Sequence, residues 1–135
     1  MSYMPTKVFL AEDDEDMRTL VSTALRNDGY EVVEARDGTE LLALLASASS
    51  TPIRLPDVIV SDVLMPGYSG IGVLAALRSS QWDVPVVLIT ARRDEAIEED
   101  AKRLGAAAFV RKPFNVDDLR VAILAAVMSA DASYA

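Results

Sequence analysis

The chain has 135 residues, contains no cysteine and no histidine, and carries a formal net charge of −8. Its length suits one domain with a hydrophobic core, and the missing residue types exclude disulfides, Cys/His zinc sites and any catalytic triad built on histidine. The negative charge repels phosphates, so we expect no direct nucleic-acid binding, and any phosphate chemistry must rely on a local cation.

No stretch of the sequence is long and apolar enough to span a bilayer, and residues 1–7 lack the apolar core of a signal peptide. We therefore expect a cytoplasmic protein with no membrane partner.

The first predicted elements are a strand, a helix and a second strand. Residues 8–11 form a short run that is apolar on both faces, which is typical of a central parallel strand. Asp14 can cap the helix that follows, and its apolar residues recur at helical spacing until Asn27-Asp28-Gly29 ends it. Residues 30–35 are more polar and predict a strand nearer the edge of the sheet.

The middle of the chain continues the alternation. Asp37-Gly38 leads into a second predicted helix at 39 to about 47, and residues 48–56 then predict an unusually long loop. Residues 58–60 predict a third strand that ends at Asp62. A third helix is expected over 69–79.

The last predicted elements are a strand at 84–90, a polar helix at 94–104, a strand at 106–110 and a helix from Asn115 to about 128. The strand-helix unit thus occurs five times, and right-handed crossovers between its strands give a parallel sheet with helices on both faces. We expect an α/β, doubly wound, five-stranded parallel sheet of strand order 2-1-3-4-5, which is a flavodoxin-like (βα)5 fold.

Four of the predicted strands end in residues that can handle a phosphoryl group. The carboxyl ends of parallel strands share one edge of the sheet, where ligands bind in open α/β folds. We therefore expect carboxylates, a hydroxyl and an amine to meet in one cleft there. The residues are Glu12-Asp13-Asp14, Asp62, Thr90 and Lys112-Pro113.

The carboxylates of this cleft indicate a metal site. Glu12 and Asp13 lie opposite Asp62 and repel it unless a cation or a proton intervenes, and a hard divalent ion such as magnesium suits oxygen ligands. Asp14 is most simply a helix cap. Asp62 can also be a cap or turn residue, but it is the only carboxylate between Val58 and Ser69, and carboxylates can accept phosphoryl groups covalently.

Each remaining candidate also has a simpler interpretation. Thr90 can be an ordinary β-branched strand residue, Lys112 a solvated lysine and Phe109 a core aromatic. Pro113 favours a functional interpretation of Lys112, because a cis X-Pro bond would turn the lysine back over the strand ends.

Together these residues resemble the receiver domain of bacterial two-component response regulators. The resemblance spans about residues 7–128 and depends on four motifs in order: the acidic pair, Asp-x-x-Met-Pro, Thr-Ala and Lys-Pro-Phe. It implies that Asp62 accepts a phosphoryl group from a sensor histidine kinase or a histidine phosphotransfer protein. It also implies Mg²⁺ as cofactor, held directly by Asp13 and Asp62, through water by Glu12, and by the backbone carbonyl of Leu64.

The same resemblance assigns the phosphate contacts and the switch. Lys112 would pair with the phosphate, Thr90 and the Ala91 amide would hold its oxygens, and Phe109 would rotate inward as Thr90 moves. Leu64 and Arg92 would line the approach of water for slow autodephosphorylation. The protein would thus catalyse its own modification without being a turnover enzyme.

The resemblance also implies an output surface. The surface formed by the fourth helix, fifth strand and fifth helix would bind different partners before and after phosphorylation. The partner would be an effector, an output domain or a second copy of the chain. Glu95, Glu98 and Glu99 of the fourth helix suit a basic partner or a plainly solvated face. We expect residues 1–135 to form a single receiver domain with no output domain.

Three positions depart from the usual receiver pattern. Glu12 stands where aspartate is commoner, Ser69 replaces a frequent aspartate, and Phe109 lacks the hydroxyl of the more usual tyrosine.

A flavin-binding protein is disfavoured because the loop after the first strand is acidic. An aspartate-based phosphatase is disfavoured because Leu64 stands where a second acid is needed. A pseudo-receiver that binds partners without being phosphorylated stays as the alternative.

Overall fold

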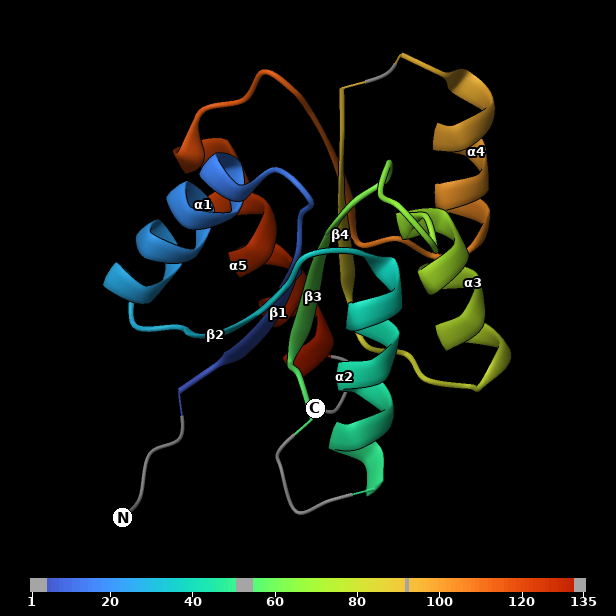
Figure 1. Cartoon of the computed structure of the whole chain (residues 1–135), viewed down its shortest axis with the longest axis horizontal. Coiled ribbons are helices and arrows are strands. Elements are labelled where there is room, and N and C mark those ends of the chain that lie inside the picture. Colours follow the sequence, from blue (N-terminus) through green and yellow to red (C-terminus); the bar gives the residue numbers. More distant parts are fainter. Residues whose placement is uncertain (1–4, 51–54, 92, 133–135) are drawn as a thin grey trace.

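The computed structural model describes residues 5–50, 55–91 and 93–132 (Figure 1). Strands and helices alternate along the chain without exception in these ranges. Their bounds are β1 (Lys7–Ala11), α1 (Glu15–Asn27), β2 (Glu31–Ala35), α2 (Gly38–Ser50), β3 (Val58–Asp62), α3 (Gly70–Ser79), β4 (Val86–Thr90), α4 (Glu95–Arg103), β5 (Ala108–Arg111) and α5 (Val116–Ala132).

The strands form one parallel sheet in the order β2-β1-β3-β4-β5, which confirms the predicted fold. β1 and β3 lie at the centre and are buried along their whole length, as their apolar runs predict. β2 lies at the edge and has one exposed residue, Glu31, in agreement with its more polar sequence. All strand carboxyl ends therefore meet at one edge of the sheet.

Each face of the sheet carries its own hydrophobic core. Side chains alternate between faces along a strand, so Phe9 packs toward α2, α3 and α4, whereas Val8 and Leu10 pack toward α1 and α5. Figure 1 shows α1 and α5 on one side of the strands and the other three helices on the opposite side. None of the helices in the described ranges is long and apolar enough to cross a membrane.

Capping side chains lie at the starts of α1, α3 and α4. Asp14 accepts a hydrogen bond from the Met17 amide at 2.9 Å at the start of α1, and Asp94 accepts from the Ala96 amide at 3.0 Å at the start of α4. Ser69, in the position where aspartate is frequent, accepts from the Gly72 amide at 3.0 Å and caps α3.

Four element boundaries differ from prediction by two residues or more. Two of them are the start of β5, at Ala108 rather than at 106, and the end of α5, at Ala132 rather than at about 128. α2 runs to Ser50 rather than to about 47, because alanines continue the helix and Ala48 is buried in the core. The long loop predicted over 48–56 is therefore shorter, and its residues 51–54 lie outside the described residues. β4 begins at Val86 rather than at 84, because Pro85 has no amide hydrogen to donate to a ladder.

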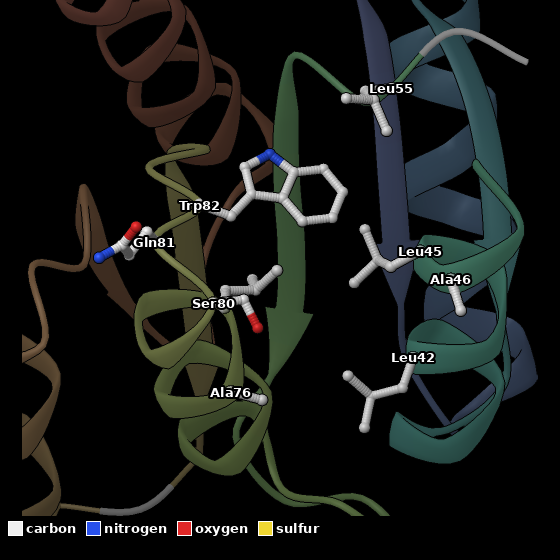
Figure 2. Close-up of a pocket in the computed structure, with 9 residues that line it drawn as sticks. Leu42, Leu45, Ala46, Leu55, Ala76, Ser80, Gln81 and Trp82 are labelled. Atoms are coloured by element: carbon white, nitrogen blue, oxygen red, sulfur yellow. The ribbon is translucent and has the colours of Figure 1, made fainter. Parts of the chain in front are cut away.

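A pocket of about 530 Å³ opens between α2 and α3 (Figure 2). Leu55 precedes β3 and Trp82 precedes β4, so the pocket lies at the amino-terminal edge of the sheet, opposite the strand ends that carry Asp62 and Thr90. Most of its lining is apolar, and Leu42, Leu45 and the Trp82 indole project into it. It does not coincide with the predicted site.

Candidate functional site

Three carboxylates meet at the carboxyl edge of the sheet. Glu12 follows β1 and Asp62 ends β3, and the two strands are direct neighbours. One carboxylate oxygen from each of Glu12, Asp13 and Asp62 lies within 4.8 Å of the others. Glu12 and Asp62 are buried, at 2% and 5% exposure, whereas Asp13 is exposed. The predicted acidic cluster is therefore present.

Backbone pairing places these carboxylates. The Glu12 amide donates to the Ala35 carbonyl at 3.1 Å, which extends the β1–β2 ladder by one residue and holds Glu12 over the strand ends. Asp62 pairs with Ile89 in the β3–β4 register, so Thr90 is the next residue along β4.

Lys112 joins the two buried carboxylates. Its Nζ donates to Glu12 Oε1 at 2.8 Å and to Asp62 Oδ2 at 2.7 Å. The Lys112-Pro113 peptide bond is cis, and the Lys112 amide donates to the Thr90 carbonyl at 2.7 Å. The cation that the acidic pocket needs is thus supplied from the end of β5.

The charges of this cluster perturb each other. Burial, followed by the hydrogen bond with Asp62, raises the pKa of Glu12 to about 7, although Lys112 acts in the opposite direction. Burial disfavours the ammonium of Lys112, but its hydrogen bonds to Asp62 and Glu12 outweigh that effect and raise the pKa of Lys112. Near neutral pH Lys112 is therefore charged, and the Glu12 carboxyl is partly protonated.

Both oxygens of Asp62 have a partner. Oδ2 accepts from Lys112, and Oδ1 accepts from the Leu64 amide at 3.1 Å. Leu64 lies in the loop between β3 and α3, and the residue is 45% exposed. This arrangement fixes the orientation of the Asp62 carboxylate before any ligand binds.

The remaining predicted residues surround the cluster. Thr90 is buried at the end of β4, and Ala91 after it is exposed. Phe109 is half-buried and packs against the core cluster on the side of α2, α3 and α4. Arg92 lies outside the described residues.

One contact of the site was not predicted. Arg18 of α1 donates from Nη1 to the Glu12 carbonyl at 2.9 Å and forms an ion pair with Glu34 at 3.4 Å. It thereby ties the backbone of the acidic pair to α1 and β2. The sequence offers no distinguishing signal for it, because Arg18 is one of several charged residues in an amphipathic helix.

The acidic face of α4 is partly paired within the chain. Glu98 forms ion pairs with Arg111 of β5 and, at 4.0 Å, with Lys102. Intramolecular pairing thus accounts for one of the three glutamates that suit either a basic partner or a solvated face.

The chain thus combines a doubly wound sheet with a carboxylate cluster and a lysine at the carboxyl edge of that sheet. The chain belongs to the family of response regulator receiver domains: the model of that family matches residues 8–124. This confirms the resemblance drawn from the sequence.

Individual relatives agree with this assignment. The transcriptional regulatory protein PdtaR of Mycobacterium tuberculosis is 36% identical over 92% of this chain and 58% of its own length. The probable transcriptional regulator ycf27 of Guillardia theta is 36% identical over 88% of this chain and 44% of its own. The chain thus spans about half the length of these curated relatives.

Solved structures give the same result. The receiver domain of a Francisella response regulator superimposes with a TM-score of 0.83 at 27% identity and covers 93% of this chain and 98% of its own. The chemotaxis protein CheY4 of Vibrio cholerae gives a TM-score of 0.75 at 33% identity, covering 90% and 98% respectively.

Proposed function

We propose that this chain is the phospho-acceptor of a two-component signalling system and that Asp62 accepts the phosphoryl group. The observation that carries the proposal is the position of Asp62, a buried carboxylate at a strand end, 2.7 Å from the Lys112 ammonium and clustered with Glu12 and Asp13. The donor would be a phosphohistidine of a sensor kinase or of a phosphotransfer protein. We place the reaction in the cytoplasm.

The carboxylate cluster fits a Mg²⁺ ion. Its members offer three oxygen atoms within 4.8 Å of one another, which is the donor chemistry that hard divalent cations prefer, and the Lys112 ammonium alone leaves a net negative charge there. Glu12, Asp13 and Asp62 would hold the ion together with the Leu64 carbonyl. When bound, Mg²⁺ neutralises charge on the transferring phosphoryl group.

The residues of the chain supply positioning for the transfer. An oxygen of Asp62 attacks phosphorus in line with the leaving nitrogen, the new O–P bond forms as the P–N bond breaks, and the electron pair stays on the imidazole. Lys112, already at hydrogen-bond distance from the nucleophile, would turn to the phosphoryl oxygens. Thr90 and the Ala91 amide would hold the same oxygens.

The modification would later be reversed at the same site. Water attacks the phosphoryl group, inorganic phosphate leaves, and Asp62 is regenerated. The protein would promote each of these steps on itself and is not proposed to turn over an external substrate.

The output would follow from a two-state rearrangement. Thr90, drawn to the phosphate, would open space for Phe109, which packs on the side of α3 and α4. The surface of α4, β5 and α5 would then favour a different partner, such as an effector, an output domain or a second copy of this chain.

Intact mass spectrometry tests the acceptor. Wild type incubated with acetyl phosphate and Mg²⁺ should gain one phosphoryl group, and the gain should vanish in Asp62→Asn and with chelator. Asp83→Asn, which removes an exposed carboxylate before β4, is the matched control and should behave as wild type. An unmodified wild type that also fails to bind Mg²⁺ would favour the pseudo-receiver, and modification of Asp62→Asn would place the acceptor elsewhere.

A further inference from the structure

The loop between β3 and α3 lies directly against the first turn of α2. Gly38 begins that helix and is buried. A Cβ atom at Gly38 would lie 1.9 Å from the carbonyl oxygen of Tyr68 and 2.7 Å from its carbonyl carbon. The Tyr68 backbone therefore occupies the space that any other side chain at position 38 would need.

A second glycine contributes from the opposite side of this contact. Gly67 has a positive φ of 78°, and a Cβ there would lie 2.3 Å from Oγ1 of Thr39. Residues 38 and 39 of α2 thus face residues 67 and 68 of the loop, and each side supplies one glycine. We call these four residues the glycine contact.

The glycine contact belongs to the same loop as the phosphorylation site. Near the start of the loop, the Leu64 amide donates to Oδ1 of Asp62 at 3.1 Å. At its end, the Gly70 amide donates to the Val63 carbonyl at 2.9 Å, and a Cβ at Gly70 would lie 2.6 Å from the Asp62 carbonyl oxygen. A displacement at 67–68 must therefore be absorbed between Asp62 and Gly70, where Leu64 lies.

The loop is the less buried partner of the contact. α2 is anchored by Leu41 and Leu45, which are buried in the core, whereas Leu64, Pro66 and Tyr68 of the loop are exposed. A side chain at position 38 would consequently push the loop away rather than the helix.

From this arrangement we infer that Gly38 is a positioning residue for the phosphorylation site. Because it lacks a side chain, the β3–α3 loop can approach α2, and the loop in turn orients Leu64 and Oδ1 of Asp62. The inference rests on the proposed function, since it assigns Gly38 to the geometry of the same metal and phosphoryl site.

The test compares two helical glycines. Isothermal titration calorimetry with Mg²⁺ should show about 10-fold weaker binding for Gly38→Ala than for wild type, as for other residues that orient metal ligands. Acetyl phosphate should also modify this variant more slowly. Gly72→Ala is the matched control, because its Cβ would meet nothing closer than 3.4 Å, and it should bind Mg²⁺ as wild type does. Alanine has a higher helix propensity than glycine at both positions. A difference in helix propensity therefore cannot explain weaker Mg²⁺ binding in only one of the two variants.

A second pair keeps the test decisive if Gly38→Ala does not fold. Gly67→Ala and Gly29→Ala both place alanine at an exposed residue of positive φ, but nothing lies within 4 Å of a Cβ at Gly29. We expect weaker Mg²⁺ binding in Gly67→Ala alone. Equal loss in both would assign the effect to backbone strain and overturn the inference.

The wild-type titration separates this inference from the proposed function. If wild type binds no Mg²⁺ and takes up no phosphoryl group, the proposed function fails and the inference with it. If wild type does both, and if Gly38→Ala and Gly67→Ala match it, only the inference fails.

Discussion

Among the charged residues of the site, Glu12 is the most deeply buried, and its pKa is strongly raised. It is 2% exposed, lies near Asp62 and shares the ammonium of Lys112 with it. Its pKa of about 7 means that the folded protein binds a proton at Glu12 at pH values where the unfolded chain does not. In the absence of metal, the contribution of Glu12 to stability therefore falls as pH rises from about 4.5 to about 7.

Glu12→Gln should remove this pH dependence. In chelator at pH 8 the variant should be more stable than wild type by on the order of 2 kcal/mol, because glutamine keeps the shape without the charge. At pH 4 the two proteins should be nearly equal. Saturating Mg²⁺ should reverse the order at pH 8, since a negative carboxylate stabilises the ion more than a neutral amide does. Denaturant unfolding at both pH values measures this. A stability difference between variant and wild type that is the same at pH 4 and pH 8 in chelator would contradict it.

The key residues of the site were predictable because strand order alone brings them together. Asp62 and Lys112 end separate strands, and a parallel sheet of order 2-1-3-4-5 necessarily places those ends along one edge. The proton affinity of Glu12 and the contact of Arg18 with its backbone were not predictable. Both depend on burial and side-chain direction, which the order of elements does not specify.

At the level of elements, Arg78 connects the end of α3 to two neighbouring segments. Its guanidinium donates to the carbonyls of Trp82 at 2.8 Å and Val84 at 3.1 Å before β4, and to those of Leu104 at 3.0 Å and Gly105 at 3.2 Å after α4. Burial lowers the pKa of Arg78. One side chain thus satisfies four carbonyls and fixes the end of α4 to α3.

Arg78→Ala should destabilise the domain by roughly 2–4 kcal/mol, because the carbonyls lose a charged donor at once. Arg78→Lys should recover only part of this loss, since an ammonium lacks the planar fork that reaches several acceptors. Arg36→Ala removes an arginine whose side chain is 75% exposed and, among the described residues, pairs with nearby Glu40, so the variant should stay within about 0.5 kcal/mol of wild type. Equal midpoints of denaturant unfolding for Arg78→Ala and Arg36→Ala would contradict the assignment.

The elements also show where local sequence suffices. Asp14 caps α1 as expected, because a cap depends on a few adjacent residues. The predicted end of α2 was wrong by about three residues. Its extension depends on the burial of Ala48 against the core, which is a tertiary contact.

On the scale of the whole molecule, hydrophobic periodicity and short connections were enough to predict the topology. Right-handed crossovers leave few arrangements for five strand-helix units, and the observed order is the predicted one. The close approach of Gly38 to Tyr68 could not be predicted, because it joins segments whose spacing depends on the packed positions of α2 and α3.

The single tryptophan gives the domain a built-in optical reporter of unfolding. Trp82 lies at the amino-terminal edge of the sheet, about 13 Å along β3 from the end that carries Asp62. Its emission should therefore stay unchanged when Mg²⁺ or a phosphoryl group reaches Asp62, and should shift only when α2 and α3 separate. Fluorescence spectra with Mg²⁺, with beryllofluoride and in denaturant test this, and a spectral shift with beryllofluoride alone would show that the two edges communicate. If Trp82 emission does not respond to phosphorylation, the same fluorescence measurement can follow unfolding of both the phosphorylated and the unphosphorylated protein.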